Sequence, residues 1–107
     1  MQALVKQISD EFKAELQKLY GDELAALILF GSHARGDSTD DSDIDFAVVL
    51  KNTSIKTSTE IFRISPASSE LGLKYRELIS IFPISSQRLG TSQMPIFQEI
   101  RKDGIYI

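Results

Sequence analysis

Two short apolar runs, joined by a polar and turn-rich segment, constrain the fold more than any other feature of the chain. The first run, Leu24–Phe30 (LAALILF), is shorter than a typical helix and is typical of a strand buried on both faces. The second run, Asp43–Leu50 (DIDFAVVL), predicts another strand. Residues 31–42 (GSHARGDSTDDS) are rich in turn formers, so we expect a loop with one helical turn between the two strands.

The remaining segments predict helices around this sheet. Apolar residues recur at helical spacing over residues 2–19. Pro66 marks the start, a kink or a break of a second helix over 58–73, and Pro83 marks the end of a third strand or a sheet edge. The other predicted elements are a strand over 77–84, a Ser/Gly-rich loop over 85–92, a helix over 95–102 and a short strand over 105–107. This order predicts an α/β (α+β) fold, a single domain over residues 1–107 with one small sheet covered by helices.

Length and composition exclude several classes of protein. The 107 residues suffice for one domain, and no apolar run reaches the roughly 20 residues needed to cross a membrane. The chain has no cysteine and one histidine, which excludes disulfide frameworks and metal sites built from cysteine or from several histidines. A net charge of -3 does not attract nucleic acid, so a long nucleic-acid substrate is not expected. The N-terminal residues lack the apolar segment of a signal peptide, and we expect a cytoplasmic protein.

A pair of carboxylates at the start of the second predicted strand is the main candidate for chemistry. Asp43 and Asp45 alternate along the strand, so both side chains point to one face and Ile44 points to the other. Two neighbouring negative charges repel each other, and one pKa rises unless a cation lies between them. Mg²⁺ fits this position, since it binds carboxylates together with water and phosphates. The alternative is that both carboxylates simply face water at the end of the sheet.

The pair Gly31–Ser32 directly follows the first predicted strand. A strand that ends in this pair and turns into a short helix offers N–H groups and a hydroxyl to an anion. Glycine lets the backbone approach a phosphate closely because it has no Cβ. A tight turn needs the same residue types, so the pair alone leaves both interpretations open. Together with the aspartates that follow after ten more residues, it predicts a site for a polyphosphate and its metal.

The segment LILFGSHARGDSTDDSDIDFAVVL resembles the DNA polymerase β-like nucleotidyltransferase superfamily, and within it the minimal nucleotidyltransferase (MNT) branch. The matching positions are the strand end, the turn after it and the aspartate pair: Phe30, Gly31, Ser32, Ala34, Arg35, Gly36, Ser42, Asp43 and Asp45. The resemblance implies a small mixed β-sheet flanked by helices. It also implies an enzyme that transfers a nucleoside monophosphate from an NTP, usually ATP, to a hydroxyl acceptor and releases pyrophosphate.

The resemblance further implies roles for individual residues. Gly31 and Ser32 would hold the β- and γ-phosphates of the nucleotide. Asp43 and Asp45 would be catalytic and would bind one or two Mg²⁺ ions, which activate the attacking oxygen and stabilise the leaving oxygen. In the family, a neighbouring strand supplies a third catalytic carboxylate. Glu77, at the very start of the third predicted strand, is the candidate for that role.

The third predicted strand departs from the full pattern of three carboxylates. Glu77 is its only acidic residue, and the deeper positions are apolar except for Ser80. If Glu77 is not a ligand, binding of the metal on the acceptor side is weak. We then expect a slow enzyme, or a protein that only binds nucleotide.

Two other residues of the loop are candidates for supporting roles. Arg35 either contacts the triphosphate with two hydrogen bonds or is a counter-ion of Asp37 or Asp40, and both interpretations stay open. His33 lies in the same turn. We interpret it as a surface or supporting residue rather than a catalytic base, because no partner for a triad is evident.

The acceptor, the preferred base and the oligomeric state are not visible in the sequence. For the MNT branch, the resemblance implies a small helical HEPN-domain partner, often in a toxin–antitoxin pair in which the MNT protein is the antitoxin and can add AMP to a tyrosine of the toxin. The leading interpretation is an Mg²⁺-dependent nucleotidyltransferase that uses ATP and modifies a partner protein. The alternatives are a non-catalytic nucleotide-binding antitoxin and a plain α/β domain whose acidic loop binds a divalent ion.

Overall fold

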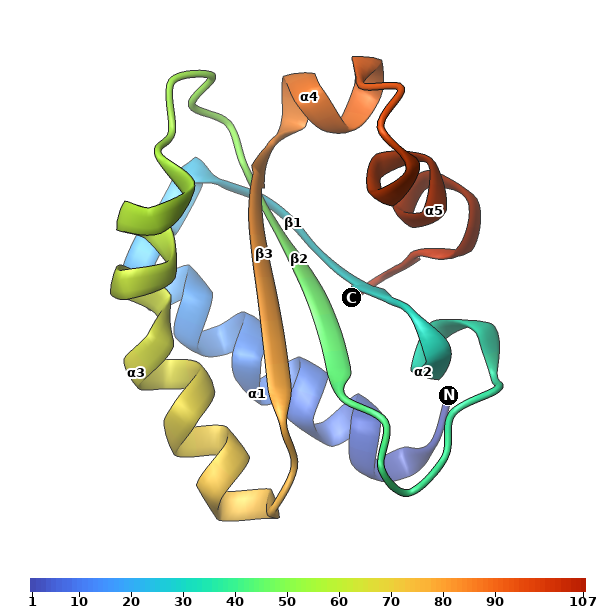
Figure 1. Ribbon diagram of the computed structural model, residues 1–107. Coiled ribbons are helices and arrows are strands. Elements are labelled where there is room, and N and C mark those ends of the chain that lie inside the picture. Colours follow the sequence, from blue (N-terminus) through green and yellow to red (C-terminus); the bar gives the residue numbers. More distant parts are fainter.

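A four-stranded sheet with helices on both faces organises the chain (Figure 1). The computed structural model describes residues 1–107. The helices in chain order are α1 (Ala3–Tyr20), the 3-10 turn η1 (Gly21–Glu23), α2 (Ser32–Arg35), α3 (Thr57–Tyr75), α4 (Ser86–Thr91) and α5 (Pro95–Asp103). The strands are β1 (Leu24–Phe30), β2 (Ile44–Leu50), β3 (Ile79–Ser85) and β4 (Ile105–Tyr106).

The sheet is mixed and has the order β3-β2-β1-β4. β1 runs antiparallel to both β2 and β4, whereas β2 and β3 are parallel. A parallel pair needs a long crossover connection, and α3 supplies it between β2 and β3. β1 and β2 are the two central strands and are covered on both faces. This double burial explains why their sequences are continuous apolar runs and do not alternate with polar residues.

Alternate residues of β2 pack into two separate cores. Phe46 faces the layer of α1 and α3, where its ring centroid lies 5.2 Å from that of Phe12. Ala47 and Val49 face the opposite layer, which is formed by α4 and α5. By the same alternation, the side chain of Asp45 points to the side of α4 and α5.

Most predicted elements are confirmed, with boundaries shifted by one or two residues. The predicted helices over 2–19, 58–73 and 95–102 correspond to α1, α3 and α5. The four predicted strands correspond to β1, β2, β3 and β4, and the helical turn expected in the loop is α2. The small mixed sheet flanked by helices is therefore the fold that the sequence predicted.

One prediction is wrong, because residues 85–92 do not form a loop. They contain helix α4. The Ser85 hydroxyl caps this helix by accepting a 3.2 Å hydrogen bond from the Arg88 N–H, and Leu89 is buried in the core beneath it. A short segment rich in serine and glycine has low helix propensity, but the cap and the burial of Leu89 outweigh that preference.

The two internal prolines occupy different environments. Pro66 lies inside α3, which continues past it to Tyr75 without a break. Pro83 lies in β3, which is an edge strand, so the interpretation of this proline as a sheet-edge residue is confirmed. None of the helices combines the length and the apolar character needed to cross a lipid bilayer.

Candidate active site

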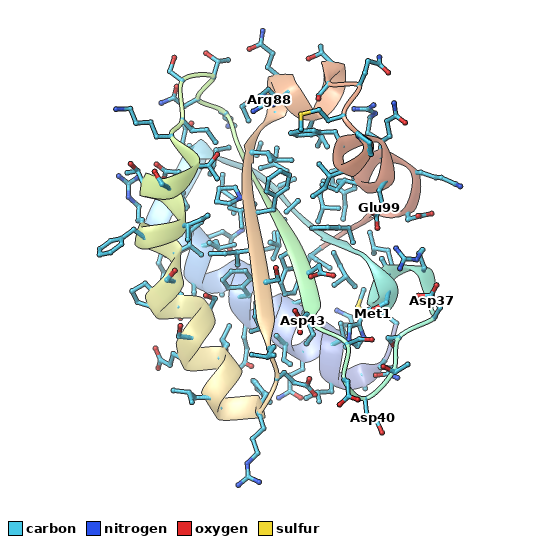
Figure 2. The ribbon with its side chains drawn as sticks, viewed as in Figure 1. Met1, Asp37, Asp40, Asp43, Arg88 and Glu99 are labelled. Atoms are coloured by element: carbon cyan, nitrogen blue, oxygen red, sulfur yellow. The ribbon has the colours of Figure 1, made fainter.

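Asp43 and Asp45 lie where the apolar core of the sheet ends. Asp43 directly precedes β2 and Asp45 is the second residue of that strand. Asp43 is exposed, Asp45 is half-buried, and Ala47, the next residue on the same face, is fully buried. The pair therefore stands at the rim of the core, with one carboxylate open to water and one partly covered. Figure 2 labels Asp43 at the start of β2 and Glu99 on α5.

The backbone of Gly31 lies directly against the carboxylate of Asp45. The antiparallel pairing of β1 with β2 puts Phe30 opposite Asp45, so the next residue meets the aspartate side chain. A Cβ at position 31 would collide with Asp45 Oδ2 and lie 3.3 Å from Cγ. Gly31 also has a φ of +74°, which favours glycine. Two independent constraints thus require glycine at position 31, and the close approach to a phosphate stays a prediction.

Burial and neighbouring charges act together on Asp45. Burial raises the pKa of its carboxyl above the usual range, and the negative charges of Asp43 and Glu99 raise it further. The charges of His33 and Arg35 lower the pKa in part. The ionised form of Asp45 is therefore disfavoured in the protein alone, and a cation beside the two aspartates would stabilise it.

Helix α2 forms the turn that follows Gly31. The Ser32 carbonyl accepts hydrogen bonds from the N–H groups of Gly36 (2.9 Å) and Asp37 (3.1 Å), which ends the helix after one turn. His33 Nε2 lies 3.4 Å from the carbonyl oxygen of Ser42, so this side chain connects the beginning of the loop to its end. This contact agrees with the supporting role that the sequence predicted for His33.

Arg35 contacts two carboxylates. Its Nε donates to Asp37 Oδ2 at 3.2 Å, and its Nη1 donates to Glu99 Oε1 at 2.7 Å. The sequence left two interpretations of Arg35 open. The contact with Asp37 corresponds to the counter-ion interpretation, whereas a contact of Arg35 with the triphosphate stays a prediction. Glu99 was missed by sequence analysis, because it lies 64 residues further along the chain and no local pattern connects the two residues.

Glu77 lies between α3 and β3, and the carbonyl of the next residue, Leu78, accepts a 2.9 Å hydrogen bond from the Ile44 N–H. The Glu77 N–H donates to the Gly72 carbonyl at 3.0 Å, and Glu77 lines a pocket with Ser68 and Leu78. The residue paired with Asp45 on β3 is Ser80. No group of three or more His, Cys, Asp or Glu side chains that could hold a metal is present. The catalytic role of Glu77 stays a prediction.

Comparison with known families identifies the family to which this combination of turn, strands and aspartates belongs. The family described as "Polymerase beta, Nucleotidyltransferase" matches residues 8–107, which is nearly the whole chain. The chain belongs to this family. The resemblance seen in the segment from Leu27 to Leu50 is therefore confirmed, and so is the polymerase β-like fold. The family assignment also confirms the prediction of a nucleotidyltransferase enzyme.

One relative of the family matches the chain almost end to end. The "putative protein adenylyltransferase MJ0141" of Methanocaldococcus jannaschii is 34% identical over 101 residues, which are 94% of this chain and 96% of that protein. Such mutual coverage fits a minimal nucleotidyltransferase, the branch that the sequence predicted.

Two solved structures share the fold of the chain. A toxin–antitoxin with AMP-PNP has a TM-score of 0.57 and 19% identity, over 89% of this chain and 68% of that one. A toxin–antitoxin MntA-HpeT mutant has a TM-score of 0.59 and 19% identity, over 92% of this chain and 70% of that one. At these identities the likeness shows that the fold is shared.

Proposed function

We propose that this nucleotidyltransferase transfers AMP from ATP to a hydroxyl group of a partner protein, with Mg²⁺ bound by Asp43 and Asp45. The observation that carries the proposal is the contact of Gly31 with Asp45. This contact joins a turn suited to phosphates to a carboxylate pair suited to the metal that accompanies them.

The residues at the rim of the core fit a divalent cation. Carboxylate oxygens are ligands that Mg²⁺ prefers, and the repulsion between Asp43 and Asp45 favours a cation beside them. Asp43 is exposed, so water and phosphate oxygens have access to the same position. When bound, Mg²⁺ would neutralise phosphate charge and activate the acceptor hydroxyl.

The turn after β1 is the proposed site for the β- and γ-phosphates. Gly31 presents its backbone without a side chain, and Ser32 offers an N–H and a hydroxyl at the start of α2. Arg35 lies at the end of the same turn and carries a positive charge. Its side chain can exchange its ion pair with Glu99 for one with a phosphate. Catalysis in such a site consists mainly of positioning and charge neutralisation.

The proposed acceptor is a tyrosine or another hydroxyl of a small helical HEPN-domain protein, which would make this chain an antitoxin. Two findings support this part of the proposal. The relative that matches end to end is named as a protein adenylyltransferase. Two solved structures that share the fold are described as toxin–antitoxin structures.

A second function, a non-catalytic nucleotide-binding antitoxin, is favoured by one specific observation. The position next to Asp45 on β3 carries Ser80 and not a carboxylate. If Glu77 does not act as the third catalytic carboxylate, the site holds two carboxylates only. Nucleotide binding would then persist while transfer is slow or absent.

Label transfer from ATP radiolabelled on the α-phosphate tests the proposal. The assay combines the purified protein, Mg²⁺ and a lysate of the source cells. It compares the wild type with the double variant Asp43→Asn/Asp45→Asn. The matched control is Asp41→Asn, which removes an exposed loop carboxylate close to the pair in sequence.

We expect a labelled protein band with the wild type and the control, and no band with the double variant. A band that survives the double substitution would overturn the proposal. Absence of a band from the wild type, despite measurable binding of Mg·ATP, would favour the non-catalytic function.

A further inference from the structure

The neighbour of Asp45 on the adjacent strand is Ser80. β2 and β3 are parallel, with Asp45 opposite Ser80 and Ile44 opposite Ile79. Neighbouring strands lie about 4.8 Å apart, and side chains at paired positions point to the same face of the sheet. Ser80 therefore stands on the face of the aspartate pair, whereas Ile44 and Ile79 turn toward the core under α1 and α3.

Ser80 also lies at the same rim of the core as the aspartates. The next residue on its face, Phe82, packs its ring 5.6 Å from that of Phe97 in α5. Ser80 itself is exposed, as Asp43 is. The helices on this side thus leave Asp43, Asp45 and Ser80 together at one open end of the sheet.

A serine and an aspartate at position 80 would differ mainly in the charge that they offer to a cation. A hydroxyl at position 80 offers a single neutral oxygen to a cation held by Asp43 and Asp45. An aspartate at the same position would add a third carboxylate within about 5 Å of Asp45, given the spacing of paired strands. Affinity for a divalent cation rises with the number of charged ligands at the site.

We propose that position 80 sets the cation affinity of the aspartate pair, and that Ser80 keeps it a low-affinity site for one divalent cation, which is completed by the phosphates of the nucleotide. The inference rests on the proposed function only in that Asp43 and Asp45 bind the cation. Its consequence is that the metal arrives together with ATP and does not reside in the protein.

Titration with Mn²⁺, followed by electron paramagnetic resonance in the absence of nucleotide, tests the inference. The proteins compared are the wild type, Ser80→Asp, Ser80→Asn and Asp43→Asn/Asp45→Asn. A further control, Ser69→Asp, adds the same charge at an exposed position of α3. We expect Ser80→Asp to bind Mn²⁺ about tenfold more tightly than the wild type, because it adds one negative charge to the site. Ser80→Asn introduces a side chain of the size of aspartate but without its charge, and it should not tighten Mn²⁺ binding. Ser69→Asp should not tighten Mn²⁺ binding either.

Thermal melting supplies a second readout that does not depend on activity. In metal-free buffer Ser80→Asp should melt below the wild type, because the new carboxylate repels Asp45. Addition of Mg²⁺ should raise its melting temperature more than that of the wild type. If Ser80→Asp does not fold, Ser80→Ala provides the test: loss of the hydroxyl oxygen should weaken Mn²⁺ binding, and an unchanged affinity would overturn the inference.

The two proposals fail in different ways. If Ser80→Asp folds and binds Mn²⁺ with the affinity of the wild type, the inference about position 80 is overturned, while the proposed function stands as long as the double aspartate variant loses binding. If the double variant binds Mn²⁺ as well as the wild type does, the aspartate pair is not the cation site, and both proposals fail.

Discussion

The guanidinium of Arg35 in α2 donates a 2.7 Å hydrogen bond to Oε1 of Glu99 in α5. This ion pair joins the turn after β1 to the C-terminal part of the chain. Both side chains remain more than a third exposed, at 37% and 39%. In the protein alone, Glu99 therefore binds the guanidinium of Arg35, which we propose contacts a phosphate of the nucleotide.

Glu99→Gln is expected to strengthen the binding of Mg·ATP several-fold, because the neutral side chain no longer competes with phosphate for Arg35. It should also lower the pKa of Asp45, since the charge of Glu99 is one of the causes that raise it. The free energy of unfolding should change by less than about 1 kcal/mol, because exposed ion pairs contribute little. Isothermal titration calorimetry with Mg·ATP measures the affinity.

Glu70→Gln is the matched control for that variant, since Glu70 is an exposed glutamate on α3. Its affinity for Mg·ATP should equal that of the wild type. Weaker binding by Glu99→Gln would show that Glu99 orients Arg35 for the nucleotide and does not compete with it.

Gly31→Ala should destabilise the fold by about 2 kcal/mol or more, because a strained backbone and a steric clash add up. The new Cβ would displace the Asp45 carboxylate, so label transfer from ATP should also be lost. Urea denaturation measures the change in the free energy of unfolding.

Gly90→Ala is the control for the glycine variant. Gly90 lies in α4, and a Cβ there meets no atom within 4 Å. This substitution should leave stability unchanged or increase it by up to about 1 kcal/mol, since alanine favours helices. Equal losses in the two variants would contradict a specific need for glycine beside Asp45.

Asp45→Asn should stabilise the protein at neutral pH in metal-free buffer. Folding raises the pKa of Asp45, so the folded protein holds the proton more tightly than the unfolded chain does, and stability falls as the pH rises through that pKa. The neutral asparagine avoids this loss, and we expect a melting temperature about 1–4 °C higher than that of the wild type.

The gain should shrink as the pH falls through the raised pKa of Asp45, and it should be absent below the usual carboxyl pKa of 3.8, where the wild type is protonated in both states. Thermal melts between pH 3 and pH 8 (about the range over which carboxyl groups titrate) measure this dependence. Asp40→Asn, at an exposed loop position, is the matched control. A lower melting temperature for Asp45→Asn than for the wild type at neutral pH would contradict the prediction that the ionised Asp45 carboxylate destabilises the fold.

Tyr20→Phe tests the link between α1 and α3. The Tyr20 hydroxyl donates a 2.7 Å hydrogen bond to Oε1 of Glu60, which is buried, and Arg63 donates to the same oxygen at 3.2 Å. Burial and the charge of Glu60 raise the pKa of Tyr20 above its usual range, so the hydroxyl stays protonated. Its loss should cost about 1–3 kcal/mol, because it removes a hydrogen bond from a buried charge.

The control for this variant is Tyr106→Phe, because the Tyr106 side chain is exposed. Urea denaturation should give it the stability of the wild type. A stability of Tyr20→Phe equal to that of the wild type would show that Arg63 alone satisfies Glu60.

The helices and strands follow from local patterns, and for that reason they were predicted with small errors. The apolar runs at β1 and β2 are continuous because both strands are central, and the helical spacing of α1 reflects the single face that it buries. Helix α4 was missed because its stability comes from the cap at Ser85 and the burial of Leu89, which are tertiary effects.

Local sequence patterns were enough to identify the residue types at the candidate site: a glycine and a serine after one strand, and two alternating aspartates at the next. These features depend on the order of neighbouring residues and on the two-residue period of a strand. Three contacts could be seen only in the folded chain: Gly31 lies against Asp45, Ser80 is paired with Asp45 on β3, and Glu99 accepts a hydrogen bond from Arg35. The register of neighbouring strands and the seating of α5 depend on how distant segments pack, and short-range patterns carry no information about such contacts.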